Sequence, residues 1–200
     1  MTHLEQPDRT STPAGPGGTP HAPADKKRLR AVARDRRARR TPAERSAFAD
    51  RLARWVPPEG TRRISCFVGV GDEPDTGPLI TALRDRGIEV LLPITLADFS
   101  LDWAVYTGDD DLADASYGLR EPVGPRLGVA ALAEVDVVLV PALSVDADGR
   151  RLGQGAGCYD RALQHVPAGT PVWAVLYDDD RLTEPLPEEP HDRRVDGVIP

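Results

Sequence analysis

The sequence has few aromatic residues, few cysteines and no long apolar runs, and each shortage excludes a class of protein. Aromatic residues make up 5% of the chain, so alanine, valine and leucine must fill most of the core. Two cysteines, Cys66 and Cys158, are too few for a disulfide framework. No apolar stretch approaches the ~18 residues that span a bilayer, and the N-terminus lacks the apolar core of a signal peptide. We therefore expect a cytoplasmic protein with no part in a membrane.

Charge is distributed unevenly along the chain. The formal net charge is −7, which argues against a protein that coats nucleic acid. Residues 25–40 nevertheless hold nine Lys or Arg against two Asp, so the rest of the chain carries −14. A basic segment on an acidic body suits a small polyanionic ligand better than a long nucleic acid.

Composition divides the chain into two parts. Residues 1–24 are rich in Pro, Gly, Thr and Ser, and such a segment cannot bury enough apolar surface to offset its ordering entropy. We predict a disordered tail over residues 1–24 and a single domain over residues 25–200.

Two helices are predicted at the start of this domain. Residues 25–40 favour a helix that is only weakly amphipathic, with Leu29 and Val32 as its apolar positions. Thr41 is the predicted N-cap of the next helix, and Glu44 completes a capping box. Three apolar residues at helical spacing are expected to face the core: Phe48, Leu52 and Trp55.

The remaining chain alternates between strand and helix patterns. Apolar runs predict strands over residues 62–70, 88–94, 101–108, 135–143 and 171–177. Helices are predicted over residues 76–87 and 159–166, the first with Leu79, Ile80 and Leu83 inward and Gly87 at its end. This alternation indicates a three-layer α/β/α domain with a mostly parallel central sheet, Rossmann-like but not a dinucleotide-binding fold.

The segment RLGQGAGCYDR, at residues 151–161, has the composition of a phosphate-binding loop. Closely spaced glycines let backbone N–H groups approach an anion, and a helix that begins after them adds its positive end. Arg151 offers a forked cationic donor to a phosphate. Asp160 is a hard oxygen ligand of the kind that Mg²⁺ takes beside nucleotide phosphates.

Other glycine motifs fit this segment poorly. A Walker loop requires G-x-x-x-x-G-K-[ST], which is absent. A dinucleotide turn requires G-x-G-x-x-G directly after a strand, whereas the spacing here is G-x-G-x-G, about a dozen residues after the strand that ends near Val140. The glycines alone leave a phosphate cradle and an idle surface loop equally open.

The flanking residues make the pattern more specific. The string PALSVDADGRRLGQGAGCYDR resembles the signature of the 5-formyltetrahydrofolate cyclo-ligases, also called 5,10-methenyltetrahydrofolate synthetases. Four further segments resemble the same family in order along the chain: KKRLR, CFVGVGDEPDTGPLI, YGLREP and EEPHDRRVDGVI. The resemblance covers most of residues 25–200.

This resemblance implies an enzyme that uses ATP and Mg²⁺ to convert 5-formyltetrahydrofolate into 5,10-methenyltetrahydrofolate, with release of ADP and phosphate. Transfer of the γ-phosphoryl group to the formyl oxygen turns a poor leaving group into phosphate, which N10 then displaces. The expected partners are therefore reduced folate and ATP, with no nucleic acid and no membrane. The small acidic enzymes of this family often act alone, so the resemblance implies a monomer.

The resemblance also implies roles for individual residues. Arg151 and Asp160 are implied as catalytic, and Asp160 and Asp192 as ligands of Mg²⁺. The implied ATP-binding residues are Lys26, Arg30, Arg151, Leu152, Gly153, Gln154, Gly155, Ala156, Gly157, Cys158 and Tyr159. The implied folate-binding residues are Val68, Glu73, Gln154, Gly155, Ala156, Gly157 and Cys158.

The residues also allow structural interpretations. Lys26 and Arg30 fit a solvated basic helix face, and Asp192 a solvated turn. Glu73 could cap the following helix, and Tyr159 could pack beneath the loop instead of stacking on a ligand. Two aromatic residues could contact the pterin but are interpreted as core or rim residues: Trp103 and Tyr117.

Three departures from the family pattern affect fine substrate contacts. Cys158 stands where a second tyrosine is common, Ala156 where glycine or a basic residue is common, and GVIP lacks the usual threonine.

Two other functions are weighed as well: a catalytically silent folate- or RNA-binding protein that uses the basic arm, and a nucleotide-dependent oxidoreductase. The complete glycine signature argues against the first, and the glycine spacing against the second.

Overall fold

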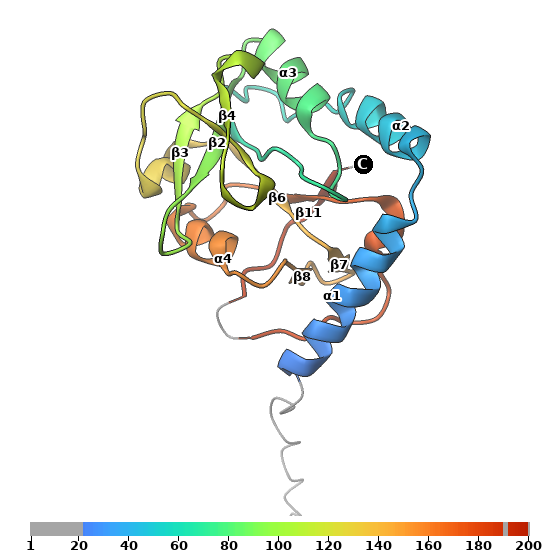
Figure 1. Cartoon of the computed structure of the whole chain (residues 1–200). Coiled ribbons are helices and arrows are strands. Elements are labelled where there is room, and N and C mark those ends of the chain that lie inside the picture. Colours follow the sequence, from blue (N-terminus) through green and yellow to red (C-terminus); the bar gives the residue numbers. More distant parts are fainter. Residues whose placement is uncertain (1–21, 190–191, 200) are drawn as a thin grey trace, which may run out of the picture.

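The computed structural model describes residues 22–189 and 192–199, which form three layers around one sheet (Figure 1). The α-helices are α1 (Ala22–Ala38), α2 (Pro42–Leu52), α3 (Gly77–Asp85) and α4 (Cys158–Ala162). The strands are β1 (Arg63–Ser65), β2 (Glu89–Thr95), β3 (Leu101–Val105), β4 (Leu112–Asp114), β5 (Arg120–Pro122), β6 (Val137–Pro141), β7 (Ser144–Asp146), β8 (Arg151–Leu152), β9 (Val172–Val175), β10 (Arg181–Leu182) and β11 (Gly197–Ile199). Short 3₁₀ helices are η1 (Asp109–Asp111), η2 (Ser116–Gly118), η3 (Val129–Glu134), η4 (Leu163–His165) and η5 (Asp178–Asp180).

The central sheet has the strand order β11-β9-β6-β1-β2-β3, in which only β3 runs antiparallel, to β2. If these six strands are numbered in the order in which they occur along the chain, their order across the sheet is 6-5-4-1-2-3. This is the strand order of a doubly wound nucleotide-binding fold, counted from the opposite edge. The order reverses between β1 and β6, which are neighbours. Ligands of such sheets bind beyond the carboxyl ends of the strands at this reversal.

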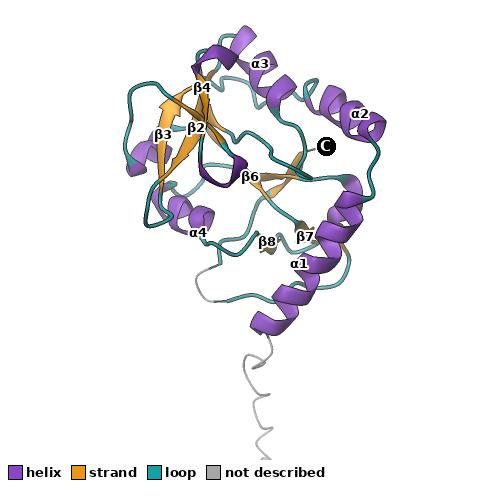
Figure 2. Ribbon diagram, in the orientation of Figure 1, coloured by secondary structure: helices purple, strands orange, loops and turns teal. Residues whose placement is uncertain are grey.

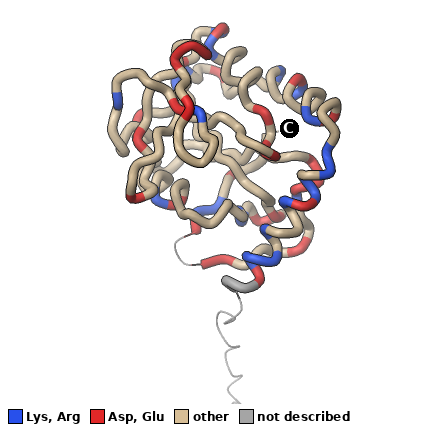
Figure 3. The backbone as a smooth tube through the Cα atoms, viewed as in Figure 1, with Lys and Arg blue, Asp and Glu red and all other residues tan. Residues whose placement is uncertain are grey.

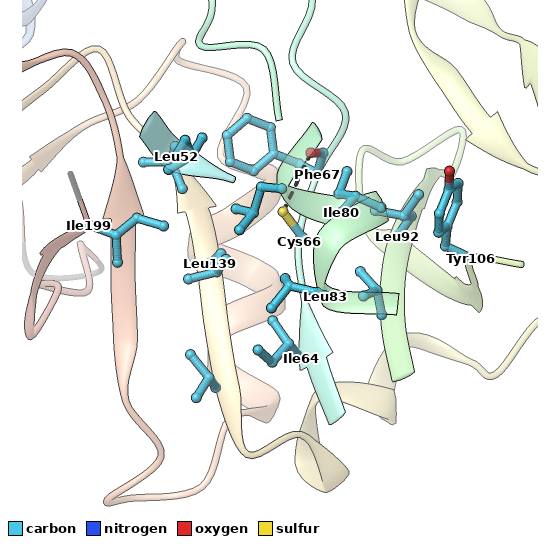
Figure 4. Packing of buried hydrophobic residues seen from close by; sticks show 14 of the residues in the cluster. Leu52, Ile64, Cys66, Phe67, Ile80, Leu83, Leu92, Tyr106, Leu139 and Ile199 are labelled. Carbon is cyan, nitrogen blue, oxygen red and sulfur yellow. Dashed lines mark hydrogen bonds between the residues drawn. The ribbon is translucent and has the colours of Figure 1, made fainter. Parts of the chain in front are cut away.

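Side chains of the strands alternate between the two faces of the sheet. The helices lie around the strands (Figure 2). On one face the sheet packs against α2 and α3, through Phe48, Leu52, Leu79, Ile80, Leu83, Ile64, Val90, Leu92, Val137 and Leu139 (Figure 4). On the other face it packs against η3, α4 and η4, through Leu132, Ala162, Leu163, Leu91, Trp103, Val138, Val140, Val172 and Ala174. The predicted three-layer α/β/α fold with a mostly parallel sheet is confirmed.

Most predicted elements are present, with shifted ends. The predicted strand over residues 62–70 ends at Ser65, because the chain then curls over the end of the sheet: Gly69 N donates to Thr76 Oγ1 at 3.0 Å and Val70 N to Glu73 Oε2 at 3.3 Å. The capping box of Thr41 and Glu44 is confirmed. The strand predicted over residues 101–108 ends at Val105.

Helix α1 differs from its prediction in two respects. It begins at Ala22, three residues before the predicted start, while residues 1–21 of the predicted tail lie outside the described part of the chain. Of its two apolar positions, Val32 is exposed, with 53% of its side chain accessible. Ala33 is buried instead, against the residues around β7 and β8 that include Leu143, Leu152 and Leu186.

Trp55 lies beyond the end of α2, where it packs partly buried at the edge of the core with its ring against Trp173. No helix among the described residues is long and apolar enough to cross a membrane.

Candidate active site

A cavity of about 470 Å³ opens where β1 and β6 reach their carboxyl ends. The residues with implied roles come from four regions of the chain: α1, the loop after β1, the glycine loop with the start of α4, and Asp192. Residues of β2, β3 and β5 and of the end of β6 complete the lining. The lining includes every residue to which the resemblance gave a role: Lys26, Arg30, Val68, Glu73, Arg151, Leu152, Gly153, Gln154, Gly155, Ala156, Gly157, Cys158, Tyr159, Asp160 and Asp192. The position beyond the switch point is the one that doubly wound sheets use for ligands.

The glycine loop joins β8 to α4 and lies against α1. Gly155 and Gly157 have φ angles of +111° and +71°, which side-chain-bearing residues rarely adopt. A Cβ atom on Gly155 would stand 3.2 Å from the guanidinium carbon of Arg30, so glycine also permits the close approach of that side chain. Arg30 Nε donates to Gly153 O at 2.9 Å. Helix α1 and the loop therefore form one basic wall of the cavity.

Arg151 and Asp160 face each other across the base of the glycine loop. The guanidinium of Arg151 donates to Asp160, and the two side chains are 4% and 23% exposed. Strand β8 holds Arg151 through its antiparallel pairing with β7, and the first turn of α4 holds Asp160. Arg151 Nε is buried without a hydrogen-bond partner among the described residues, so this guanidinium retains a donor for a bound group.

Lys26 forms the second ion-pair cluster of the cavity. Its Nζ donates to Glu189 Oε2 at 2.7 Å and to Asp192 Oδ2 at 2.5 Å, and Asp192 also accepts from Glu189 N at 2.7 Å. Burial opposes the charged form of Lys26, but hydrogen bonds to the two carboxylates outweigh it, and the pKa of Lys26 is raised. Lys26 is therefore a buried cation and not part of a solvated face.

Glu73 lies at the opposite wall and does not cap α3. Its carboxylate accepts from Val70 N and from Gln154 Nε2, both at 3.3 Å. The first free N–H of α3, at Gly77, is bonded instead by Asp75 Oδ1 at 2.9 Å. The capping interpretation of Glu73 is therefore wrong, and its carboxylate is available at the cavity surface.

Tyr159 packs beneath the loop and contacts both sides of the core. Its hydroxyl is buried with no hydrogen-bond partner among the described residues, and burial raises its pKa well above the ordinary value. A phenol in this state is a neutral donor, and Tyr159 is among the residues that line the cavity. Trp103 is fully buried, which confirms its interpretation as a core residue.

An aromatic pair lies on the rim. Tyr117 is strongly exposed and lines the cavity, and its ring centroid lies 6.3 Å from that of Phe99. Both residues have φ near +63°, an unusual conformation for bulky side chains that is found at ligand clamps. Arg161 joins this rim to the glycine loop, because its Nη2 donates to Phe99 O and to Ala156 O, each at 2.9 Å.

Several lining residues stand in the segments that carry the family resemblance but were given no role in the site. Phe67, Pro141, Ala142 and Leu143 reach the cavity because they follow the ends of β1 and β6. Glu189 and Arg120 are ordinary surface types in sequence, and only the fold brings them to the cavity. A position at or just after the end of a buried parallel strand is a further signal that could have identified the first group.

The donor set of the cavity fits a nucleotide phosphate more directly than a protein-bound metal. No group of three or more His, Cys, Asp or Glu among the described residues is placed to hold a metal ion. Mg²⁺ bound with a nucleotide needs only one or two carboxylates, since phosphates and water supply the other ligands. Asp160 and Asp192 provide hard oxygens of this kind, and the free donor of Arg151 suits a phosphate.

Comparison with known proteins gives a consistent result. The family model described as "5-formyltetrahydrofolate cyclo-ligase family" matches residues 23–200. A 5-formyltetrahydrofolate cyclo-ligase of Mycolicibacterium smegmatis is 40% identical over 185 residues, which cover 89% of this chain and 94% of the relative. One of Escherichia coli is 31% identical over 173 residues, 83% of this chain and 94% of the relative. The solved 5,10-methenyltetrahydrofolate synthetase of Aquifex aeolicus superposes with a TM-score of 0.73 at 25% identity, covering 86% of this chain and 88% of that one.

Proposed function

The chain belongs to the 5-formyltetrahydrofolate cyclo-ligase family, and from that premise we propose how its cavity carries out the family's reaction. The enzyme is a ligase that cyclises 5-formyltetrahydrofolate to 5,10-methenyltetrahydrofolate with ATP. The one observation that supports our assignment of the site is that residues from four distant segments line a single cavity.

The reaction requires that oxygen leave the formyl carbon. The formamide oxygen attacks the γ-phosphorus of ATP, and ADP departs. The lone pair of N10 then attacks the activated carbon, N10 loses its proton, and the C–O electrons leave with phosphate. Phosphoryl transfer needs no covalent bond to the protein. Catalysis therefore depends on positioning the two substrates and on neutralising the charge of the phosphates.

The side of the cavity that we assign to the nucleotide supplies the positive charge that neutralises the phosphates. Arg151 and Lys26 are buried cations, Arg30 lies against the glycine loop, and Arg151 Nε has a free donor. We assign these three side chains and the backbone of residues 152–159 to the triphosphate. Asp160 and Asp192 would hold Mg²⁺, which when bound neutralises phosphate charge.

The folate side lies across the glycine loop. Glu73 offers carboxylate oxygens that pair naturally with the N–H groups of a pterin, and Val68 forms an apolar wall next to it. Residues 154–158 lie between the two walls, and Gln154 contacts Glu73 directly. This loop is therefore assigned to both ligands, as a transfer between them requires.

The basic arm is better explained as part of the enzyme than as an RNA-binding surface. Four of the nine basic residues of α1 and the turn after it are paired with acidic residues of the chain's own C-terminal half, namely Lys26, Arg36, Arg37 and Arg40. Figure 3 shows the basic and acidic segments that lie along α1. We place the enzyme in the cytoplasm as a monomer, with Cys66 and Cys158 as free thiols.

The test follows methenyl absorbance with purified protein, 5-formyltetrahydrofolate and ATP, with and without a chelator of divalent cations. Product is expected only with ATP and Mg²⁺ together. Arg151→Ala is expected to lower kcat about 10²- to 10³-fold, the usual loss for one charge-stabilising donor. Arg194→Ala is the matched control, because Arg194 is paired with Glu188 outside the cavity. Unchanged turnover in Arg151→Ala would refute the assigned role.

A further inference from the structure

A buried carboxylate outside the cavity joins two segments that line it. Asp146 is the last residue of β7, and its side chain is 1% exposed. Burial raises the pKa of this carboxyl group, but the hydrogen bonds that it accepts outweigh burial, and the pKa of Asp146 is lowered. Asp146 is therefore a buried anion at neutral pH, and it is not among the residues that line the cavity.

The two oxygens of Asp146 bond both to its own turn and to a distant segment. Oδ1 accepts from the backbone N–H groups of Asp148 and Arg150, at 2.9 and 2.8 Å. Oδ2 accepts from Leu186 N at 2.8 Å and from Arg150 Nη1 at 3.1 Å. One carboxylate thus ties the β7–β8 turn, residues 146–150, to the C-terminal part of the chain.

The β7–β8 turn also holds this C-terminal segment at its far end. Val195 N donates to Gly149 O at 2.8 Å. Gly149 has a φ of +79°, and a Cβ atom there would stand 2.3 Å from Val195 O, so a side chain would exclude this approach. Residues 186–195, which carry Glu189 and Asp192 into the cavity lining, are therefore bonded to the turn at both ends.

The same turn leads directly into the glycine loop. Arg151, the first residue of β8, follows the turn and lines the cavity. The β7–β8 turn is thus covalently continuous with Arg151 and hydrogen-bonded to the segment that carries Asp192. The distance between these two side chains depends on how this segment is held to the turn.

We propose that Asp146 is a positioning residue for the nucleotide, which sets the placement of Asp192 relative to Arg151. The inference rests on the proposed function, in which Arg151 binds the triphosphate and Asp192 holds Mg²⁺. Asp146 touches neither ligand and acts through the backbone of the two segments that it joins. A displacement of about 1 Å in a group that positions a substrate can cost on the order of 100-fold in rate.

Asp146→Asn tests this role with little change in side-chain size. An amide offers an acceptor oxygen on one side only, whereas the carboxylate accepts on both. Either the N–H groups of the turn or Leu186 N then faces an amide NH₂ group, so one of the two connections is lost. The folate wall of Val68 and Glu73 belongs to another segment, the loop after β1, so the two ligands should respond differently.

The experiment measures by calorimetry the affinity of the variant for two ligands separately. One is the non-hydrolysable ATP analogue adenylyl imidodiphosphate in saturating Mg²⁺, and the other is 5-formyltetrahydrofolate without nucleotide. We expect Asp146→Asn to lower affinity for the analogue about 10- to 100-fold, the usual loss when the support of a metal site is removed. Affinity for the folate is expected to fall much less. The same split is expected in steady-state kinetics, where KM rises for ATP and stays nearly unchanged for the folate.

Asp148→Asn is the matched control. Asp148 lies in the same turn and pairs with the same Arg150, but its side chain is 60% exposed. This variant is expected to bind both ligands as the unaltered protein does. If Asp146→Asn does not fold, Arg150→Ala takes its place, because it removes the side-chain bonds to Asp146 and to Glu188 and is expected to change the affinities in the same direction.

Two results would overturn the positioning role and leave the proposed function intact. The folded variant could bind the analogue as tightly as the unaltered protein, or it could lose affinity for both ligands equally, as a general loosening of the fold would cause. An unaltered protein that binds neither ligand and forms no methenyl product contradicts the proposed function instead.

Discussion

At Cys158 a thiol stands in the wall of the cavity, at the position where the family resemblance leads one to expect a second tyrosine. Burial raises the pKa of this thiol, and the nearby Arg161 opposes that shift only in part. The group is therefore a neutral thiol at neutral pH and not an activated nucleophile. Cys66 lies fully buried in the core, where desolvation raises its pKa to about 12.

The pKa of Cys158 predicts how the native protein reacts with iodoacetamide. Only the thiolate reacts, so a raised pKa lowers the reactive fraction at any given pH. Alkylation of Cys158 is expected to be slower than that of free cysteine at pH 7 and to accelerate as pH rises through and beyond the ordinary value of 9.0. Mass spectrometry of the native protein measures the rate at each pH.

Cys158→Ser provides the control, because it leaves only buried Cys66 and is expected to take up no label while folded. Alkylation of Cys158 that is faster than that of free cysteine at neutral pH contradicts this account. Such a result would restore the nucleophile interpretation.

At the scale of elements, α1 is the part of the fold that sequence reasoning described least well. Its buried face runs through Lys26, Ala33 and Arg37, at helical spacing, yet two of these residues are charged. A search for apolar periodicity selected Leu29 and Val32 instead, because it does not count charged side chains as buried. This face of α1 is polar because acidic residues of the C-terminal half lie against it. They are more than 140 residues away from their basic partners along the chain.

The other elements follow from local patterns. The capping box at Thr41, the inward residues of α3 and the apolar strands were all predictable, because each depends on neighbours a few residues away. The glycine loop was predictable for the same reason. Strand ends and the Lys26 cluster were not, because the fold decides them through long-range contacts.

Arg37 and Asp180 anchor α1 to the floor of the cavity. Arg37 Nε donates to Asp180 Oδ2 at 2.8 Å, and its Nη2 donates to Ala142 O at 2.5 Å. Both side chains are almost fully buried, so the loss of one partner leaves an uncompensated charge. Asp180→Ala is expected to lower the free energy of unfolding by about 3–5 kcal/mol, measured by denaturant titration.

Asp35→Ala is the matched control, since Asp35 pairs with Arg39 on the exposed side of the same helix. Exposed ion pairs contribute little to the free energy of unfolding, so Asp35→Ala is expected to unfold at nearly the same denaturant concentration as the unaltered protein. Similar losses in the two variants would contradict the view that the buried pair anchors α1.

At the scale of the whole molecule, the site is a consequence of topology. The strand order reverses between β1 and β6, and the loops that leave these strands diverge there and open the cavity. At one side of the cavity, the Lys26 cluster joins α1 to Glu189 and Asp192 from the other end of the domain. The residues that we propose for the nucleotide and for the folate thereby line one cavity.

The central claim is that this space brings the formyl oxygen to the γ-phosphorus of ATP. The most direct measurement uses 5-formyltetrahydrofolate labelled with ¹⁸O in the formyl group, followed by mass spectrometry of the released phosphate. The account predicts that each turnover transfers one labelled oxygen from the formyl group to inorganic phosphate. Methenyl formation with unlabelled phosphate, and with the label in water, would contradict it.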